Sequence, residues 1–329
     1  MKDAFGRTVN YLRVSVTDRC NYRCNYCMAE EMTFLPRKEL LTLEELQRIC
    51  GVFIGLGVNK LRITGGEPLV RRDIMSLFRS LGDYIPSGDL GELTLTTNGA
   101  LLERYATEVA EAGVKRINVS LDTLNSDIFA ELTRTGRYSE VIEGIQAASD
   151  AGLKVKINTV ALKGVNDGEL DDLLAWCGQG GHDISFIESM PMGEIGDHRA
   201  DTFMSLDEVK ERLHENWTLS ASNFTSAGPS RYMDIAETGQ RVGFIAPYSH
   251  NFCESCNRVR LTCTGVLYLC LGQDDSVDLR APLRSGASDQ ELADVILEAM
   301  QRKPKGHDFD ENRLDDGAQV IRFMNTTGG

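Results

Sequence analysis

Three cysteines near the start of the chain have the spacing of a metal-binding motif. Cys20, Cys24 and Cys27 form a C-x3-C-x2-C pattern, directly after the β-branched and apolar run Leu12–Val16. A structural zinc ion normally takes four protein ligands, whereas a four-iron cluster held by three cysteines leaves one iron free. The pattern therefore favours an iron–sulfur cluster with an open iron. Three buried or redox-active cysteines are the alternative interpretation.

A second cysteine group lies near the other end of the chain. It contains a C-x2-C pair, Cys253 and Cys256, followed by Cys263 and Cys270. Four cysteines could close a structural zinc site, but a zinc ribbon has two C-x2-C pairs and this segment has one. We therefore expect a second metal centre with one cysteine left over, and the zinc site stays open as an alternative.

Two arginines follow this group at alternate positions, Arg258 and Arg260. Alternate side chains of an extended segment point to the same side. Arginine offers paired donors to phosphate, so this pair beside a metal centre indicates an anion site. A solvated pair on a strand is the alternative.

Composition limits the class of protein. The chain has 329 residues, of which 42% are hydrophobic and 26% charged, and its net charge is −14. This describes a globular chain of one or two domains, and the negative charge disfavours nucleic acids and anionic membranes as partners. The sequence has no apolar leader and no apolar run long enough to span a bilayer, so we expect a cytoplasmic protein. Nine cysteines in such a protein indicate metal binding or catalysis rather than disulfides.

The first part of the chain alternates β-branched runs with helical stretches, which predicts six βα units with parallel strands. Thr42 and Glu45 form a capping box that begins the first long helix. Polar or turn-forming residues follow several of the strands, where βα barrels carry their functional loops. The expected strands are Leu12–Val16, Leu61–Thr64, Leu93–Thr96, Ile117–Leu121, Val155–Val160 and Ile184–Ile187.

The pattern changes after about residue 202. A helix over 206–213 leads to a Ser/Gly-rich connector, and two short runs, Arg231–Ala236 and Arg241–Ile245, predict a hairpin. We therefore expect a barrel domain over 1–219 and a C-terminal segment over 220–329.

The first cysteine motif, with Gly65-Gly66-Glu67-Pro68 after the second strand, resembles the radical S-adenosylmethionine (SAM) superfamily. The resemblance implies an incomplete (β/α)6 barrel of the TIM type. It also implies that Cys20, Cys24 and Cys27 hold a 4Fe-4S cluster whose open iron binds SAM. By the same resemblance, the SAM site is lined by Tyr26, Gly66, Ser120 and Met190.

The resemblance narrows to the GTP-cyclising branch of this superfamily, which acts first in molybdenum-cofactor biosynthesis. It rests on Phe5-Gly6-Arg7, on 12–21, on 60–69, on Phe252–Arg258 and on the final Gly328-Gly329. It implies that Cys253, Cys256 and Cys270 bind a second 4Fe-4S cluster and that Cys263 is a spectator. It implies catalytic roles for Arg13, Arg258 and Arg260. The residues implied to bind GTP are Arg13, Arg62, Thr96, Lys156, Arg258 and Arg260.

The same resemblance implies the reaction and its partners. A 5′-deoxyadenosyl radical is expected to take the C3′ hydrogen from the ribose of GTP. The resulting carbon radical is then expected to add to C8 of the guanine. An electron donor such as flavodoxin or ferredoxin, transfer of the product to cyclic pyranopterin monophosphate synthase, and a homodimer are also expected. Ser185 stands where this branch usually has arginine, which predicts weaker triphosphate binding or compensation by Arg71 or Arg72.

Two other functions remain open. The first is a radical SAM peptide maturase, whose C-terminal cluster serves a peptide substrate. The second is a metal-binding or redox-sensing module without catalytic activity. A peptide substrate would give the arginines no polyanion to bind, and metal analysis distinguishes the second alternative from an enzyme.

Overall fold

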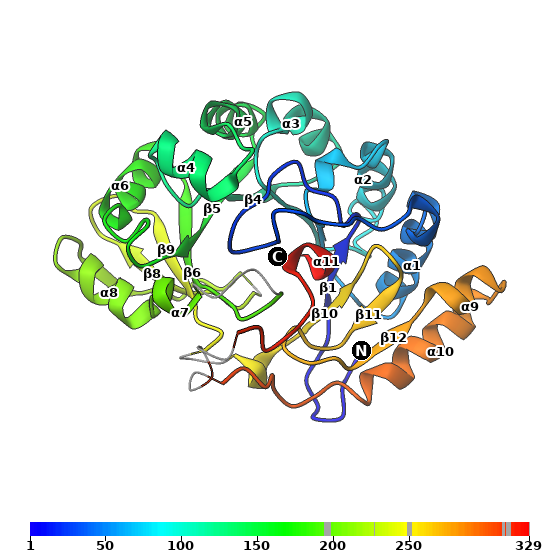
Figure 1. The fold of residues 1–329 in the computed structure, drawn as a ribbon. Coiled ribbons are helices and arrows are strands. Elements are labelled where there is room, and N and C mark those ends of the chain that lie inside the picture. Colours follow the sequence, from blue (N-terminus) through cyan, green and yellow to red (C-terminus); the bar gives the residue numbers. More distant parts are fainter. Residues whose placement is uncertain (194–198, 227, 249–251, 311–312, 314–316, 329) are drawn as a thin grey trace.

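The structure, a computed structural model, describes residues 1–329 apart from 194–198, 227, 249–251, 311–312, 314–316 and 329. Its strands form one twelve-stranded sheet in the order β12-β11-β10-β1-β2-β3-β4-β5-β6-β9-β8-β7. The sheet curves into an open barrel, with α1 to α6 on its outside and the C-terminal end of the chain at its centre (Figure 1).

The six expected strands are all present, each within one residue of its expected bounds, and neighbours in this series pair in parallel. Their side chains are buried along most of each strand, because the helices cover one face and the barrel interior lies on the other. The strands are β1 (Tyr11–Ser15), β2 (Lys60–Thr64), β3 (Glu92–Thr97), β4 (Arg116–Ser120), β5 (Lys154–Ala161) and β6 (Asp183–Glu188).

The outer helices follow the strands as predicted. The Thr42 hydroxyl accepts from the Glu45 amide and the Glu45 carboxylate accepts from the Thr42 amide, so the capping box is confirmed. Leu46, Ile49 and Phe53 of the following helix are buried against the sheet. These helices are α1 (Leu43–Gly55), α2 (Ile74–Gly82), α3 (Leu102–Glu111), α4 (Ser126–Thr133), α5 (Tyr138–Asp150) and α6 (Leu170–Gly180).

The C-terminal part of the chain extends the same sheet at both ends. Strand β9 (Arg241–Ile245) pairs in parallel with β6, and β10 (Arg258–Leu261) pairs in parallel with β1. The predicted hairpin is β8 (Arg231–Ile235) with β9, followed at the sheet edge by β7 (Leu219–Ala221). At the other edge lie β11 (Val266–Tyr268) and β12 (Ser276–Asp278). The expected domain boundary at 219/220 therefore falls inside a strand that belongs to the common sheet.

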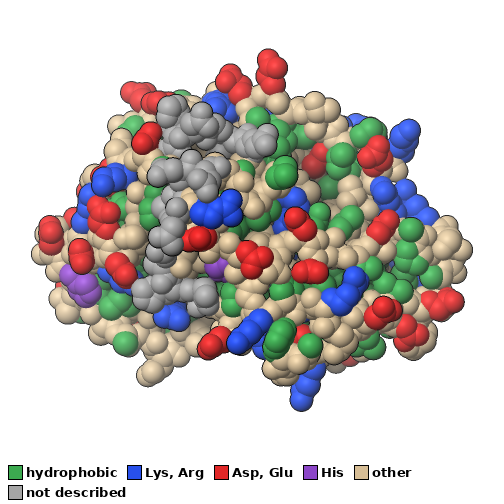
Figure 2. Space-filling model, turned by 60° about the horizontal axis from the view of Figure 1, so that its bottom comes forward, with side chains coloured by type: hydrophobic (Ala, Val, Ile, Leu, Met, Phe, Trp, Pro, Cys, Tyr) green, Lys and Arg blue, Asp and Glu red, His purple; other side chains and the backbone are tan. Residues whose placement is uncertain are grey.

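The remaining helices are peripheral, except the last. They are α7 (Arg199–Thr202), α8 (Leu206–His214), α9 (Arg280–Arg284), α10 (Asp289–Met300) and α11 (Met324–Thr327). Helix α11 lies in the mouth of the barrel against β1 (Figure 1). Within the described residues, no helix has both the length and the apolar character that crossing a bilayer requires. Acidic and basic side chains are interspersed on the face shown in Figure 2.

Candidate active site

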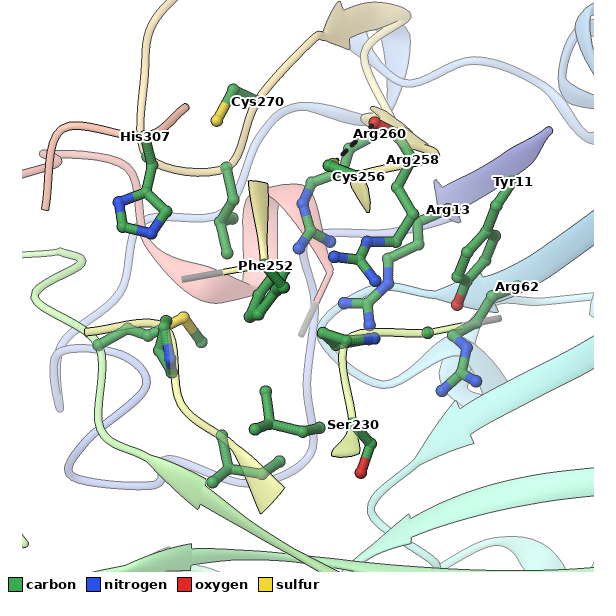
Figure 3. A pocket seen from close by; sticks show the side chains of 18 of the residues that line it. Tyr11, Arg13, Arg62, Ser230, Phe252, Cys256, Arg258, Arg260, Cys270 and His307 are labelled. Carbon is green, nitrogen blue, oxygen red and sulfur yellow. Dashed lines mark hydrogen bonds between the residues drawn. The ribbon is translucent and has the colours of Figure 1, made fainter. Parts of the chain in front are cut away.

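Strand register gathers positive charge on the inner side of the barrel. In the parallel pairings of β1, Tyr11 lies opposite Arg258 and Lys60, and Arg13 lies opposite Arg260 and Arg62. Residues opposite one another in a sheet share a face. The alternate basic residues of three neighbouring strands therefore converge, and in Figure 3 the side chains of Arg13, Arg258 and Arg260 point into one space.

That space is a cavity with a strongly cationic lining. Among the described residues that line it there are six arginines and lysines and no aspartate or glutamate. In a chain with a net charge of −14, this is a local excess that a polyanion would neutralise. The six cations are Arg13, Arg62, Arg116, Lys156, Arg258 and Arg260.

Several of these cations are buried with few partners. Burial lowers the pKa of Arg62 and of Lys156, and it lowers that of Arg260 further, with Arg13 and Arg258 adding repulsion. The Nε atoms of Arg13 and Arg62 are buried without a hydrogen-bond partner among the residues that the structure describes. Buried donors normally have partners, so these atoms indicate the position of an anionic ligand.

Tyr11 belongs to the same cluster. The residue is 1% exposed, and its hydroxyl is buried with no hydrogen-bond partner in the described part of the chain. Burial alone would raise the pKa of Tyr11, but the charges of Arg62, Arg13, Lys60 and Arg258 outweigh it and lower the pKa to about 7. The hydroxyl is therefore held where a bound anion would share the same cations.

A second cavity adjoins the first. Cys20, Cys24 and Cys27 line it, together with the four residues expected at the SAM site, Tyr26, Gly66, Ser120 and Met190. The two cavities share part of their lining, so they lie side by side inside the barrel. The shared residues are Asn158, Ile187, Met190 and Met324.

The Gly-Gly-Glu-Pro loop is packed against the segment that precedes the first cysteine. The amides of Gly66 and Glu67 donate to the carbonyls of Thr17 and Arg19, both at 2.8 Å. A Cβ on Gly66 would overlap the Arg19 backbone, so glycine is required for this approach. The buried Glu67 carboxylate accepts from the amides of Leu69 and Asn98 and fixes the loop to the end of β3.

The cysteines of this cavity are partly buried. The Tyr22 amide donates to Cys20 Sγ at 3.4 Å, and the Asn98 side-chain amide does so at 3.8 Å. Burial raises the pKa of Cys20 to about 11 and that of Cys27 to about 12. Metal centres bind the deprotonated thiol, so loading of this site releases protons.

The second cysteine group borders the cationic cavity. Cys253, Cys256 and Cys270 line it, whereas Cys263 is fully buried and does not. Burial opposes ionisation of Cys256, but Lys303 and Arg258 outweigh it and lower the pKa of this thiol. No three His, Cys, Asp or Glu side chains of the described residues meet closely enough to hold one metal ion. In a four-iron cluster each cysteine binds a separate iron, so the three sulfur atoms need not meet at a single metal ion.

The C-terminal tail enters the site. Met324 lines both cavities, and the Asn325 side chain donates to the Asp18 carbonyl at 2.8 Å. Arg260 Nη1 donates to the Gly328 carbonyl at 3.2 Å. Gly329 lies outside the described residues.

Most of the expected substrate residues line the cationic cavity, but two expectations differ from the structure. Thr96 lines the second cavity and reaches the first through its hydroxyl, which accepts from Arg62 Nη1 at 3.0 Å. Arg71 donates to the carbonyls of Val16 and Leu41, and neither it nor Arg72 lines the cavity. Compensation for Ser185 from these two arginines is therefore not supported, whereas Arg116 is a further cation that lines the cavity.

Sequence reasoning missed Tyr11 and Arg116, which line the cationic cavity. Asn98 and Asp122 line the other cavity and belong to the polar segments expected after the strands. Tyr26 donates to the Asp122 carboxylate at 2.5 Å, and burial raises the pKa of Asp122 to about 6. Their signal in the sequence was position, since Asn98 and Asp122 each follow a strand and Arg116 begins one.

Comparison with known proteins identifies the family. A model described as the radical SAM superfamily matches residues 14–177, and one described as Molybdenum Cofactor Synthesis C matches 182–309. The chain is 59% identical over 328 residues to a GTP 3′,8-cyclase of Paracoccus denitrificans (strain Pd 1222), covering 99% of this chain and 95% of that protein. This chain belongs to the GTP 3′,8-cyclase family. A family member of Rhizobium meliloti (strain 1021) is also 59% identical, over 329 residues, covering 100% of this chain and 94% of that protein.

Family membership confirms the radical SAM assignment, and with it an enzyme that uses SAM and an iron–sulfur cluster. Solved structures confirm the expected fold class. Streptococcus suis SuiB bound to S-adenosylmethionine aligns with a TM-score of 0.58 at 15% identity, covering 97% of this chain and 77% of that chain. SuiB bound to the precursor peptide SuiA aligns with a TM-score of 0.55 at 18% identity, covering 88% and 64%.

Proposed function

We propose that this chain cyclises GTP to (8S)-3′,8-cyclo-7,8-dihydroguanosine 5′-triphosphate, the first step of molybdopterin biosynthesis. The observation that carries the proposal is the cavity whose described lining holds six cations and no carboxylate, and which adjoins the cavity lined by Cys20, Cys24 and Cys27. A triphosphate neutralises such a lining, and a ribose attached to it would lie toward the second cavity. Relatives named GTP 3′,8-cyclase at 59% identity support the same substrate.

The residues divide into two sets. Arg13, Arg258 and Arg260 hold the triphosphate and orient the ribose, and they are the catalytic residues of the proposal because a small misplacement of the reacting carbon slows a reaction strongly. Arg62 and Lys156 extend the phosphate site, and Thr96 orients Arg62. Tyr26, Gly66, Ser120 and Met190 form the SAM site.

Both cysteine groups suit iron–sulfur clusters. Each supplies three cysteines to one cavity wall, Cys20, Cys24 and Cys27 in one and Cys253, Cys256 and Cys270 in the other. When bound, the first cluster and SAM would supply, with one electron from a reductant, the 5′-deoxyadenosyl radical that the removal of the C3′ hydrogen of GTP requires. The protein contributes enclosure, because buried strands and the C-terminal tail keep water from the reacting groups.

The proposal includes partners. A radical SAM enzyme requires a reductant, and we propose a flavodoxin or a ferredoxin for this role. We further propose that the product passes to cyclic pyranopterin monophosphate synthase, that the chain forms a homodimer and that it acts in the cytoplasm.

Isotope transfer tests the reaction. Anaerobically reconstituted protein is incubated with dithionite, SAM and GTP deuterated at C3′, and 5′-deoxyadenosine is analysed by mass spectrometry. We expect deuterium in the deoxyadenosine. Unlabelled deoxyadenosine would refute C3′ as the hydrogen source. A zinc-loaded protein without sulfide would instead favour the metal-binding module.

A further inference from the structure

A buried lysine lies beside the second cysteine group. Lys303 follows α10 and is 2% exposed. Its ammonium group donates to the Leu269 carbonyl at 2.6 Å and to Cys256 Sγ at 3.6 Å. Among the described residues, no carboxylate lies within ion-pair distance of it.

An ammonium in this position needs a negative partner. Removing such a charge from water is costly unless it is paired, and a single carbonyl does not neutralise it. Cys256 is the hydrogen-bonded group that can carry a negative charge. Lys303 also interacts electrostatically with Cys253 and Cys270, so its charge acts on the whole group.

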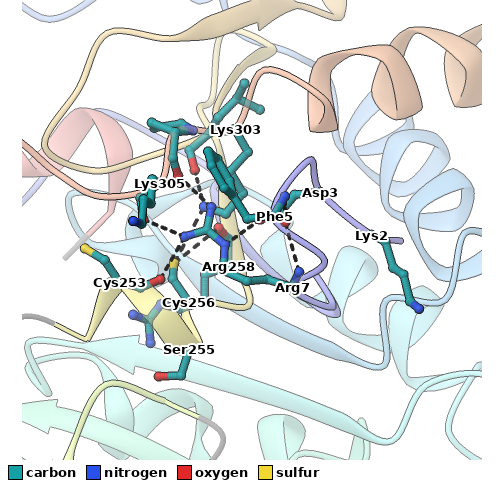
Figure 4. A network of polar contacts seen from close by, with 12 residues as sticks. Lys2, Asp3, Phe5, Arg7, Cys253, Ser255, Cys256, Arg258, Lys303 and Lys305 are labelled. Carbon is teal, nitrogen blue, oxygen red and sulfur yellow. Dashed lines mark hydrogen bonds and ion pairs between the residues drawn. The ribbon is translucent and has the colours of Figure 1, made fainter.

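Arg7 fixes the segment that carries this lysine. Its guanidinium donates to the carbonyls of Cys253 at 2.8 Å, Pro304 at 2.6 Å and Lys305 at 2.8 Å, and it pairs with the buried Asp3 (Figure 4). One side chain therefore joins the N-terminal loop, the backbone of a cysteine and the backbone next to Lys303. The ammonium is held in place rather than free to swing into solvent.

We propose that Lys303 is the counter-ion of the second iron–sulfur cluster and raises its reduction potential. The inference rests on the proposed function, which assigns Cys253, Cys256 and Cys270 to that cluster. Reduction adds negative charge, so a fixed positive charge stabilises the reduced form more than the oxidised one. Hydrogen bonds to the sulfurs and the local net charge are established determinants of cluster potential.

The test compares Lys303→Met with Lys305→Met in the reconstituted full chain. Both variants remove one positive charge, but Lys305 is exposed, so water screens its charge more strongly than that of the buried Lys303. Reduction is followed by EPR-monitored titration, with the first cluster recognised by the response of its signal to SAM. We expect Lys303→Met to shift the second cluster to a more negative potential, roughly a tenfold or greater loss of reduced cluster at a fixed potential. Lys305→Met should leave both clusters unchanged.

Iron and sulfide content separates the possible failures. Two four-iron clusters hold about eight iron atoms. If the wild-type chain holds the iron of one cluster instead, the proposed function itself is wrong. If both clusters are present and Lys303→Met leaves the second potential unchanged, only the role of Lys303 is wrong. If Lys303→Met does not retain the second cluster, Lys303→Gln replaces it in the test, because glutamine keeps a donor for the Leu269 carbonyl without the positive charge. The proposal then requires the same negative shift of the reduction potential in Lys303→Gln.

Discussion

Arg260 Nη1 and the Gly328 carbonyl are joined by a hydrogen bond of 3.2 Å inside the barrel. Arg260 is one of the proposed triphosphate ligands, and Gly328 belongs to the C-terminal tail. The tail is therefore linked directly to a substrate-binding cation. A bound triphosphate and the tail carbonyl compete for, or share, the donors of one guanidinium.

The tail glycine provides the first prediction. Gly328 has a φ of 74°, and a Cβ at this position would overlap the hydroxyl of Thr64. We expect Gly328→Ala to displace the tail and to reduce the rate of GTP turnover by about a hundredfold, with iron content unchanged. Gly317→Ala is the matched control, because Gly317 has a φ of 82° and nothing within 4 Å of the added Cβ. Equal turnover by the two variants would contradict a role for the tail.

Tyr11 should give the metal-free chain a tyrosine that ionises near neutral pH. Its pKa of about 7 lies below the ordinary 10.0, because Arg62, Arg13, Lys60 and Arg258 outweigh burial. Between about pH 7 and pH 10 the folded chain has lost this proton and the unfolded chain still holds it. The ionisation of Tyr11 therefore increases the free energy of unfolding as the pH rises from about 7 to 10. This contribution is lost as the pH falls through about 7.

Ultraviolet difference titration of wild type against Tyr11→Phe measures this ionisation, and denaturant unfolding at several pH values measures the stability. Binding of GTP should raise the pKa again, because the phosphates neutralise the same cations. Tyrosinate appearing only near pH 10 would refute the electrostatic description of the cavity.

Ligand choice in the second cysteine group is the third prediction. Cys270 lines the cationic cavity, whereas Cys263 is fully buried away from it and its carbonyl accepts from the Leu41 amide at 2.7 Å. Cys270→Ser should lose about half of the iron, and Cys263→Ser should keep both clusters. Iron and sulfide analysis of the two reconstituted variants decides which cysteine is the ligand. If iron is lost from Cys263→Ser and not from Cys270→Ser, Cys263 is the ligand and Cys270 is not.

Arg116 is expected to replace the cation that is absent at Ser185. It lines the cavity, and its guanidinium is oriented by Glu92 at 2.7 Å. The Ser185 hydroxyl, in contrast, forms a hydrogen bond of 3.0 Å with the Ser230 hydroxyl. Arg116→Met should raise KM for GTP about tenfold, the usual scale for losing one hydrogen bond to a charged group. Arg71→Met is the control, and a similar rise in KM for that variant would contradict this assignment.

The sequence predicted the elements whose pattern is local. Six strands and the helix capped by Thr42 were found within a residue or so, because burial on both faces and a capping box are visible in short windows. The pairing of β10 with β1 was not predicted, since nothing in a short window specifies a partner that is distant along the chain.

The same limit applies to the site. Arg258 and Arg260 were identified from their spacing beside the cysteines and Arg13 through family resemblance, and the convergence of the three depends on that unpredicted pairing. Tyr11 was missed because a tyrosine that begins a strand is ordinary until the register places cations on both sides. Lys303 was missed because it lies in a polar tail, where lysine is normally exposed.

The position of β1 between β2 and β10 has a consequence for biosynthesis on the ribosome. Tyr11–Ser15 are translated early, but one edge of this strand has no partner until Arg258–Leu261 have emerged. During most of translation that edge is an exposed template for other chains. The nascent barrel therefore matures late, and we expect truncated chains that end before residue 258 to aggregate and to lack affinity for nucleotides.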